Sequence, residues 1–191
     1  MHLVLASASP RRADLLRAAG FTFDTLPVDV DERFLPGEKP GEAVSRLAEA
    51  KAVAAATALG PDAVVLGADT TVVIGGQALG KPADTTDAER MLRLLSGQSH
   101  EVMTGMCLLQ GQRRLVHVET SRVRMAPLSE AEIAWYASTG EPSDKAGAYA
   151  VQGLGSRFIE GIEGSYSNVV GLPISSLYTL MKELGCAILA I

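Results

Sequence analysis

The sequence of 191 residues has little cysteine, little histidine and no excess of positive charge, and each shortage excludes a class of protein. Its two cysteines, Cys107 and Cys186, lie far apart in apolar segments, so we expect buried thiols rather than a disulfide framework or a metal site. The three histidines are isolated, which leaves no zinc-type spacing and no Ser/His/Asp or Cys/His arrangement. The formal net charge is −5, so phosphate binding must come from local groups of cations, and a small anionic ligand fits better than nucleic acid.

Long hydrophobic runs are also missing. No segment approaches the roughly 18 apolar residues of a membrane span, and the first predicted strand begins at Met1 without a positively charged leader. We therefore expect a soluble, cytoplasmic protein with no membrane partner. The chain has no linker, repeat or low-complexity segment and is 47% hydrophobic, so we expect residues 1–191 to form a single domain with two lobes.

What is present is an alternation of strand and helix patterns, which is typical of an α/β protein. The predicted elements are strands over 2–6, 21–25, 63–74 and 187–189, helices over 10–19, 41–58, 84–95 and 129–138, two β segments over 100–125 around Gly111, a hairpin turn at Gly75-Gly76, and a last helix starting at Pro173. Together they predict a mixed, strongly twisted sheet flanked by helices, in two lobes with a central cleft.

The segment Ser7-Ala8-Ser9-Pro10-Arg11-Arg12 follows an apolar strand and opens a helix. Ser9 can cap that helix, and Pro10 suits its first position. Free backbone N–H groups and the arginine side chains can then converge on a phosphate. The alternative is an ordinary capped amphipathic helix with its leucines inward and with Arg11 and Arg12 in solvent.

Two charged residues interrupt apolar patterns. Asp69 lies between two apolar stretches of one predicted strand, and a buried carboxylate without a partner costs several kcal/mol. It therefore needs a metal, a cation or hydrogen bonds, unless it is a turn or cap aspartate. Lys51 follows Val44, Leu47 and Ala48 at helical spacing and so lies on an apolar stripe. Its ammonium either snorkels at the helix end or points into the same cleft as Asp69.

Two glycine motifs resemble nucleotide-binding loops but fail in detail. Residues 75–82 match a P-loop up to Lys81, but Pro82 replaces the Ser or Thr that would hold magnesium. Lys81 either faces a phosphate or is an ordinary exposed turn lysine. Residues 153–158 have Phe158 where a dinucleotide motif needs glycine. The remaining carboxylates and cations suit metal-assisted chemistry on a polyphosphate, with Mg or Mn as the metal. They are Asp31, Glu32, Asp69, Arg11, Arg12, Lys51, Lys81 and Lys145.

These segments together resemble the Maf family of nucleoside triphosphate pyrophosphatases, also called septum formation proteins. The resemblance spans nearly the whole chain. It rests on LASASPRRADLL at 5–16, the acidic loop at 29–32, Lys51, GADTTV at 67–72, LGKP at 79–82, SGQSHEVMTG at 96–105 and GEPSDKAGAYAVQGLGSRFIEGIEGSYSNVVGLPI at 140–174.

The resemblance implies a two-lobed fold with an elongated sheet, related to the inosine triphosphate pyrophosphatases and often found as a homodimer. It also implies cleavage of a nucleoside triphosphate between the α and β phosphates, with a divalent cation. Asp69 would accept the proton of the attacking water, and Glu32 and Asp69 would hold the metal, two roles that overlap in Asp69. The catalytic residues that the resemblance implies are Asp69, Glu32, Lys51 and Lys81. The residues that would grip the triphosphate and offset charge on the leaving pyrophosphate are Ser7, Arg12, Lys51 and Lys81.

The family divides by substrate, and three positions match the branch that hydrolyses dTTP and UTP. They are Arg11, Thr70 and Gln152. A Gln amide can pair with a pyrimidine edge through one donor and one acceptor, although Gln152 is otherwise a polar loop residue beside Gly153. The implied function is house-cleaning of nucleotide pools, with a role in cell division arrest. The alternatives are a pyrophosphatase for 7-methyl-GTP or other modified nucleotides, and a non-catalytic nucleotide-binding regulator of cell division.

Overall fold

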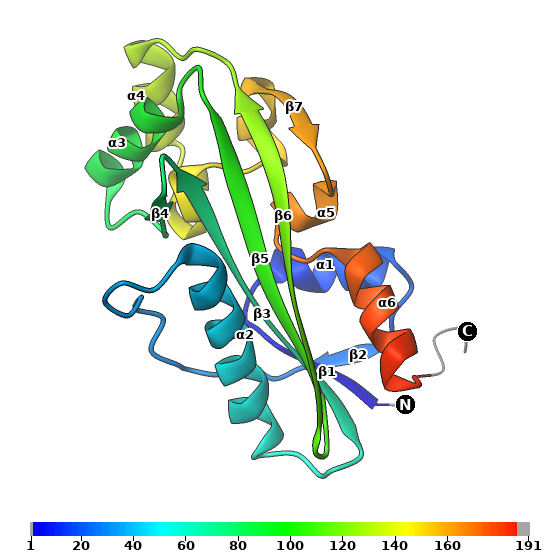
Figure 1. The fold of residues 1–191 in the computed structure, drawn as a ribbon. Helices are drawn as coiled ribbons and strands as arrows, with labels where there is room; N and C mark the ends of the chain where they lie inside the picture. The colour runs from blue at the N-terminus through cyan, green and yellow to red at the C-terminus, as the bar shows by residue number, and fades with distance from the viewer. Residues whose placement is uncertain (1, 187–191) are drawn as a thin grey trace. The chain divides into compact units, whose positions relative to one another are not determined.

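The computed structural model describes residues 2–186, which form a seven-stranded sheet with helices packed on it (Figure 1). The strand order is β2-β1-β3-β5-β6-β7, and β4 pairs with β3. Parallel pairing joins β1 to β2 and β3, whereas β4 on β3 and β7 on β6 are antiparallel. The predicted α/β fold with a mixed sheet is confirmed. The strands are β1 (His2–Ala6), β2 (Phe23–Thr25), β3 (Ala63–Ile74), β4 (Gln77–Leu79), β5 (Ser99–Gln110), β6 (Arg113–Met125) and β7 (Ile159–Glu163).

The helices match the predicted ones within a few residues, and several short elements were not predicted. The α-helices are α1 (Pro10–Ala18), α2 (Pro40–Ala56), α3 (Thr85–Leu95), α4 (Glu130–Ser138), α5 (Tyr166–Val170) and α6 (Ile174–Leu184). Three 3-10 helices, η1 (Glu141–Asp144), η2 (Ala146–Ala148) and η3 (Gly153–Phe158), lie in a stretch for which no element was predicted, as do β7 and α5. The strand predicted over 187–189 lies outside the described residues.

The chain divides into two compact units, each with a core of its own. Unit 1 comprises, among the described residues, 2–69, 104–119 and 171–186, and unit 2 comprises 70–103 and 120–170. Strands β3, β5 and β6 contribute residues to both units. Whether residues 1–191 act as one domain with two lobes stays a prediction.

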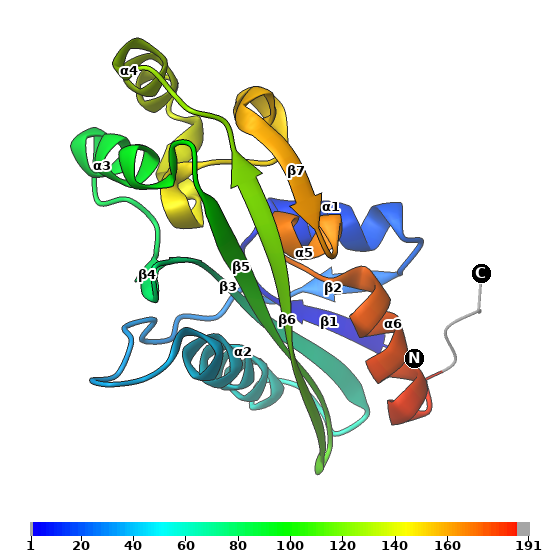
Figure 2. The ribbon, with the colours of Figure 1, turned by 45° about the horizontal axis from the view of Figure 1, so that its top comes forward.

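The core of unit 1 has two layers because side chains alternate across its strands. Leu66 and the apolar residues of α1 and α6 belong to one cluster, whereas Val65 and the alanines of α2 belong to another. Helix α2 therefore covers one face of β3 in this unit, and α1 with α6 covers the other (Figures 1 and 2). The alanine-rich layer sets how closely α2 approaches the sheet.

The core of unit 2 lies under α3 and α4. It is built from apolar residues of those helices, from the inward residues of its strands and from aromatic side chains of the irregular stretch, among them Tyr149 and Phe158. Tyr136 of α4 is fully buried in it, with its ring edge-on to Phe158. This core holds residues 141–170 in place through their apolar side chains, although most of these residues belong to no sheet or long helix.

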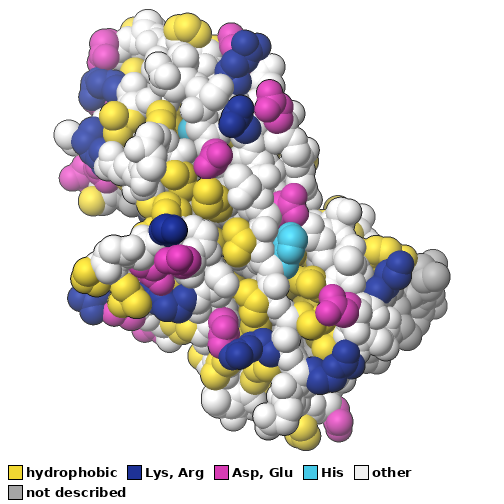
Figure 3. Space-filling view, in the orientation of Figure 1, with side chains coloured by type: hydrophobic (Ala, Val, Ile, Leu, Met, Phe, Trp, Pro, Cys, Tyr) yellow, Lys and Arg dark blue, Asp and Glu magenta, His cyan; other side chains and the backbone are white. Residues whose placement is uncertain are grey.

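Figure 3 shows one face of the molecule with its charged side chains coloured by sign. The face in Figure 3 has basic and acidic side chains close to one another, with no wide field of one sign over the described residues. This agrees with the expectation that cations for phosphate binding occur only in local groups. Among residues 2–186, no helix combines the length and the apolar character needed to cross a membrane.

Candidate functional site

Lys51 of α2 makes ion pairs with two carboxylates in unit 1. Its Nζ lies 2.7 Å from Asp69 Oδ1 at the end of the apolar part of β3, and 2.5 Å from Glu32 Oε1 in the acidic loop. The Lys51 and Asp69 side chains are 9% and 13% exposed, whereas Glu32 is 49% exposed. Lys51 and Asp69 therefore form a largely buried ion pair, and removing one partner would leave an uncompensated buried charge. Glu32 is the more exposed of the two carboxylates. Of the two interpretations of Lys51, the one that directs its ammonium to Asp69 is confirmed.

Two glycines let α2 lie close enough for this contact. A Cβ at Gly67 of β3 would come within 2.1 Å of the Ala48 carbonyl oxygen, and one at Gly105 of β5 within 2.2 Å of the Val44 carbonyl oxygen. Those distances leave no space for any side chain, because the atoms that would be met belong to the helix backbone. The glycines thus fix the depth of α2 against the sheet, and with it the height at which Lys51 reaches Asp69.

Arg12 is buried, so the interpretation that left it in solvent is wrong. Its Nε donates to the Gly171 carbonyl at 2.8 Å, and its Nη1 donates to Ser7 Oγ at 3.0 Å and to the Ala68 carbonyl at 2.9 Å. Burial lowers the pKa of the Arg12 guanidinium, while the Asp69 carboxylate acts to raise it. Arg12 therefore links the start of α1 to the residue after β1 and to the middle of β3, directly before Asp69.

The start of α1 differs in one respect from its prediction. Ser9 occupies the N-cap position, but its side chain makes no capping hydrogen bond. Instead, the Ser9 backbone N–H donates to Ser7 Oγ at 3.2 Å, the same hydroxyl that accepts from Arg12. Pro10 does occupy the start of the helix, as predicted, and Arg11 beside it is half-buried. The hydroxyl that organises this corner is Ser7, not Ser9.

The acidic loop is held in shape by ion pairs of its own. Arg46 of α2 donates to both carboxylate oxygens of Glu38, at 2.6 and 2.8 Å, and its Nη2 also donates to the Arg33 carbonyl at 3.1 Å. Asp31 pairs with Arg33 at 2.6 Å in solvent, and this hydrogen bonding lowers the pKa of Asp31 to about 2. Asp31 is therefore engaged within the loop, and Glu32 is the loop carboxylate that reaches Lys51.

The two carboxylates at Lys51 are possible ligands of a divalent cation. Within residues 2–186, no group of three or more His, Cys, Asp and Glu side chains is placed to hold a metal. Glu32 and Asp69 nevertheless fit one, because both carboxylates already converge on a single cationic atom and offer only oxygen donors. Magnesium in phosphate-processing sites is commonly held by one or two carboxylates plus substrate phosphates. The pair fits a site of that kind.

The remaining predicted site residues belong to unit 2. Thr70 follows Asp69 in β3 and is half-buried, Lys81 is exposed directly after β4, and Gln152 is exposed at the N-cap position of η3. Lys145 is half-buried, and its Nζ donates to the Glu141 carbonyl at 2.6 Å and contacts the neighbouring carboxylate of its own segment. The structure thus brings Ser7, Arg12, Lys51, Glu32 and Asp69 together within unit 1.

One polar residue of unit 2 was missed by the sequence interpretation. Glu141 accepts hydrogen bonds from the Tyr136 hydroxyl and from the backbone N–H groups of Leu154 and Gly155. Nothing in the pattern around Gly140, a single acidic residue before a proline, distinguishes it from a surface turn. Only the three-dimensional path of residues 141–155 reveals its partners.

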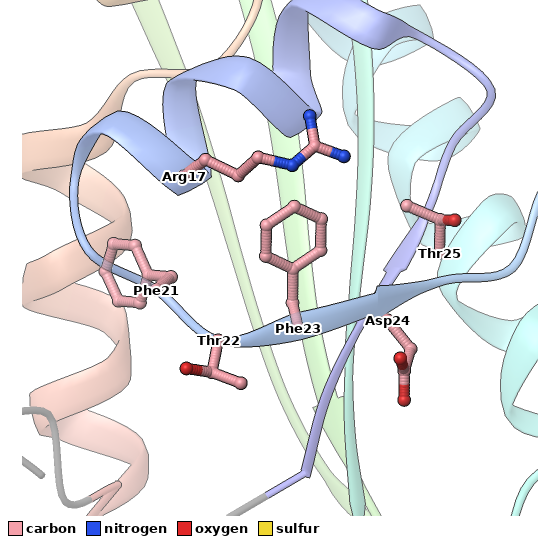
Figure 4. A pocket seen from close by; sticks show the side chains of 6 residues that line it. All are labelled: Arg17, Phe21, Thr22, Phe23, Asp24 and Thr25. Atoms are coloured by element: carbon pink, nitrogen blue, oxygen red, sulfur yellow. The ribbon is translucent and has the colours of Figure 1, made fainter. Parts of the chain in front are cut away.

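A surface hollow beside α1 and β2 is not part of this site (Figure 4). It is lined by Arg17, Thr22, Asp24, Thr25 and two phenylalanines, and it contains no predicted site residue. The Arg17 guanidinium lies 5.6 Å from the centre of the Phe23 ring and 2.8 Å from an Asp14 oxygen, so its charge is already compensated. The Lys51 cluster is therefore the candidate site of unit 1.

Comparisons with known proteins identify similar chains that match over nearly the whole length. The profile of the family described as Maf-like protein matches residues 2–184. A protein named dTTP/UTP pyrophosphatase from Koribacter versatilis is 52% identical over 185 residues, which cover 97% of this chain and 95% of that protein. One of the same name from Anaeromyxobacter dehalogenans is 51% identical over 188 residues, covering 96% and 94%. The solved structure of the Staphylococcus aureus Ham1 protein is similar in fold, with a TM-score of 0.53 and 14% identity over 96% of this chain and 100% of that one.

Proposed function

This chain belongs to the Maf-like protein family, and we propose that it hydrolyses dTTP and UTP to the nucleoside monophosphate and pyrophosphate. Relatives that are 52% and 51% identical over nearly their whole length carry the name of that activity. In the structure, the observation that carries the proposal is the buried Lys51–Asp69 pair with Glu32 on the same ammonium. A reaction on a polyanion needs a held base and nearby cations, and this cluster supplies both.

Asp69 is the base in this proposal. Its carboxylate takes a proton from the attacking water while the anhydride bond between the α and β phosphates breaks and pyrophosphate leaves. The Lys51 ammonium, 2.7 Å from Asp69 Oδ1, keeps the carboxylate in place and adds positive charge beside the reacting phosphates. Burial of the pair strengthens both effects, because the charges are shielded from water.

Glu32 and Asp69 are the residues proposed to hold a divalent cation, Mg²⁺ or Mn²⁺. When bound, such an ion neutralises phosphate charge and increases the acidity of a coordinated water. Glu32 suits this role because its side chain is half-exposed on a loop, whereas the Asp69 side chain is only 13% exposed. The support is the chemistry of the two oxygen donors and their convergence on one cation.

Further contacts with the triphosphate are assigned to Ser7, Arg12, Lys51 and Lys81. The geometry favours an indirect role of Arg12 in triphosphate binding, because its guanidinium donates hydrogen bonds to Ser7 and to two backbone carbonyls. It orients the Ser7 hydroxyl and the backbone before Asp69 while contributing charge. Lys81 is exposed after β4, and its long side chain ends in a compact ammonium of the kind that binds phosphate.

Selection of the nucleobase of the substrate is assigned to Arg11, Thr70 and Gln152. Gln152 is exposed and its amide carries one acceptor and two donors, which suits the edge of uracil or thymine. Support for all three positions comes from the sequence resemblance to the dTTP/UTP branch. Gln152 replaced by Ala tests the assignment, because the choice among bases should change more than the rate on all of them.

The test of the function is pyrophosphate release from a panel of dTTP, UTP, CTP, GTP and 7-methyl-GTP, with Mg²⁺, with Mn²⁺ and with chelator. We expect metal-dependent release mainly from dTTP and UTP. Preference for 7-methyl-GTP would overturn the choice of substrate while leaving the reaction in place. Binding of nucleotides without any turnover would replace the enzyme by a nucleotide-binding regulator.

We also propose that the active form is a cytoplasmic homodimer acting on small nucleoside triphosphates. The support is the family resemblance, in which dimers are common. Light scattering on the purified chain tests the assembly: a mass of one chain at micromolar concentration contradicts it, and a mass of two chains agrees with it.

A further inference from the structure

The segment that carries Gln152 is held on both sides by one polar pair. Before Gln152, the backbone N–H of Ala150 donates to the Tyr136 hydroxyl at 3.0 Å. After it, the N–H groups of Leu154 and Gly155 donate to the Glu141 carboxylate, each at 2.9 Å. Tyr136 and Glu141 are themselves joined, since the Tyr136 hydroxyl donates to Glu141 Oε1 at 2.8 Å. The two side chains thus form a single anchor, the Tyr136–Glu141 anchor, for both ends of residues 150–155.

The fit between Glu141 and the segment is close. A Cβ at Gly153, whose φ is +69°, would come within 2.4 Å of Glu141 Oε2. Burial acts to raise the pKa of Glu141, but the hydrogen bonds from Leu154, Gly155 and Tyr136 and the charge of Lys145 together lower it below its usual value. The carboxylate is therefore ionised at neutral pH and acts only as an acceptor, which is what three converging donors require.

The backbone between Glu141 and residues 150–155 is also under constraint. Ala148 is fully buried with φ +58°, a left-handed conformation that costs a side-chain-bearing residue energy. The preceding Gly147 has φ +70° and donates its N–H to the Gly80 carbonyl at 3.0 Å. A segment with strained residues needs strong local contacts to keep one conformation. The Tyr136–Glu141 anchor supplies such contacts around Gln152.

We infer that Glu141 and Tyr136 are positioning residues for base selectivity, which they exert by fixing the backbone on either side of Gln152. This inference rests on the proposed function, because it assigns Gln152 the role of reading the pyrimidine edge. An amide discriminates uracil from cytosine only if its donor and acceptor are presented in a fixed position, since the two bases offer reversed donor and acceptor atoms. The anchor provides that fixed starting point for the Gln152 side chain.

The first test is Glu141→Gln. The substitution keeps the shape but places an NH₂ group where a carboxylate oxygen faced an N–H donor, so at least one of the three hydrogen bonds is lost. We expect the ratio of kcat/KM for UTP over CTP to fall about three- to tenfold, the size of one misplaced hydrogen bond. Most of the change should be a higher KM for UTP, because Asp69 and Lys51 are unchanged.

The matched control is Glu132→Gln in α4, the helix that carries Tyr136. Glu132 accepts from the Ser129 N–H and hydroxyl in the capping box of α4, and none of its hydrogen bonds involves residues 150–155. Loss of the Glu132 carboxylate should lower the stability of the fold without changing the ratio of kcat/KM for UTP over CTP. If Glu141→Gln folds poorly, Tyr136→Phe replaces it, because this variant removes only the hydroxyl and leaves the ring in the core.

A second readout does not depend on turnover. Amide hydrogen exchange of a peptide covering residues 150–155 should become faster in Glu141→Gln and Tyr136→Phe and stay unchanged in Glu132→Gln. An unchanged UTP to CTP ratio in both anchor variants of an active enzyme overturns the inference. If the wild-type protein turns over neither dTTP nor UTP, the proposed function is wrong. In that case, unchanged hydrogen exchange of residues 150–155 in both anchor variants would show separately that the Tyr136–Glu141 anchor does not hold this segment.

Discussion

Replacing Gly67 by Ala tests whether the depth of α2 against the sheet controls the Lys51–Asp69 contact. The new Cβ would lie 2.1 Å from the Ala48 carbonyl oxygen and 2.7 Å from the Ala52 backbone nitrogen. Ordinary contact begins at 3.4 Å, so α2 would have to retreat by about 1.3 Å along this direction. Lys51 lies between those two alanines in the helix, and its ammonium would retreat with them.

The size of the effect follows from that retreat. Both atoms belong to helix backbone and cannot rotate away, so the cost should reach or exceed the upper end of the about 1–3 kcal/mol typical of overpacking. A displacement of about 1 Å at catalytic groups commonly lowers rates by about a hundredfold. We therefore expect Gly67→Ala to lower the urea midpoint of unfolding and to reduce pyrophosphate release from dTTP by about that factor in the fraction that folds.

Gly41→Ala is the control within the same helix. A Cβ there meets no atom within 4 Å, and the residue lies in the first turn of α2, so the change should leave the stability unchanged or raise it by at most about 0.5 kcal/mol. The two variants are compared by urea unfolding and by steady-state kinetics. Wild-type stability together with wild-type turnover in Gly67→Ala would refute the reasoning, because the distance between α2 and the sheet would then not be fixed by the contact at Gly67.

Three further outcomes are expected. Asp69→Asn should keep nucleotide binding, measured by calorimetry, but lose at least about a hundredfold in turnover, whereas undiminished turnover would remove Asp69 from the reaction. Hydrogen bonding to Arg46 lowers the pKa of Glu38 to about 2, below its usual 4.5, so this pair stabilises the fold above about pH 4.5 and loses its effect as the pH falls toward 2. The stability difference between wild type and Glu38→Gln, measured by urea unfolding, should therefore shrink from pH 6 to pH 3, and a constant difference would contradict it. Burial raises the pKa of the Cys107 thiol to about 11, so in a Cys186→Ser background a thiol reagent at pH 8 should react only after urea is added, and rapid labelling of the folded protein would disprove this.

The regular part of the fold could be predicted because its signals are local. The apolar run of β3, the capping box at Ser129 and the Gly75-Gly76 turn each specify their element through side-chain type and spacing alone. The stretch 141–170 could not be predicted in this way. Its 3-10 turns depend on hydrogen bonds such as those of Glu141 with residues 13 and 14 positions away. Hydrophobic periodicity does not predict hydrogen bonds of this kind.

The candidate site could be predicted in part for the same reason. Asp69 and Lys51 interrupt apolar patterns, so burial and a need for partners followed from the sequence. The pattern did not identify which carboxylate of the acidic loop reaches Lys51, because Asp31 and Glu32 are adjacent and equally polar. That choice is made by the Arg33 and Arg46 contacts of the loop, which are known only once the chain is folded.

Two kinds of structure carry the proposed chemistry and the proposed selectivity. Lys51 and Asp69 lie on a long helix and a long strand whose spacing is fixed by glycine and alanine contacts, so most changes there cost both stability and rate. Gln152 lies in an irregular segment whose path depends on a few hydrogen bonds to Tyr136 and Glu141. Substitutions within residues 141–155 can therefore alter which base is accepted while the Lys51–Asp69 pair is untouched. A family built in this way can divide by substrate and keep one reaction.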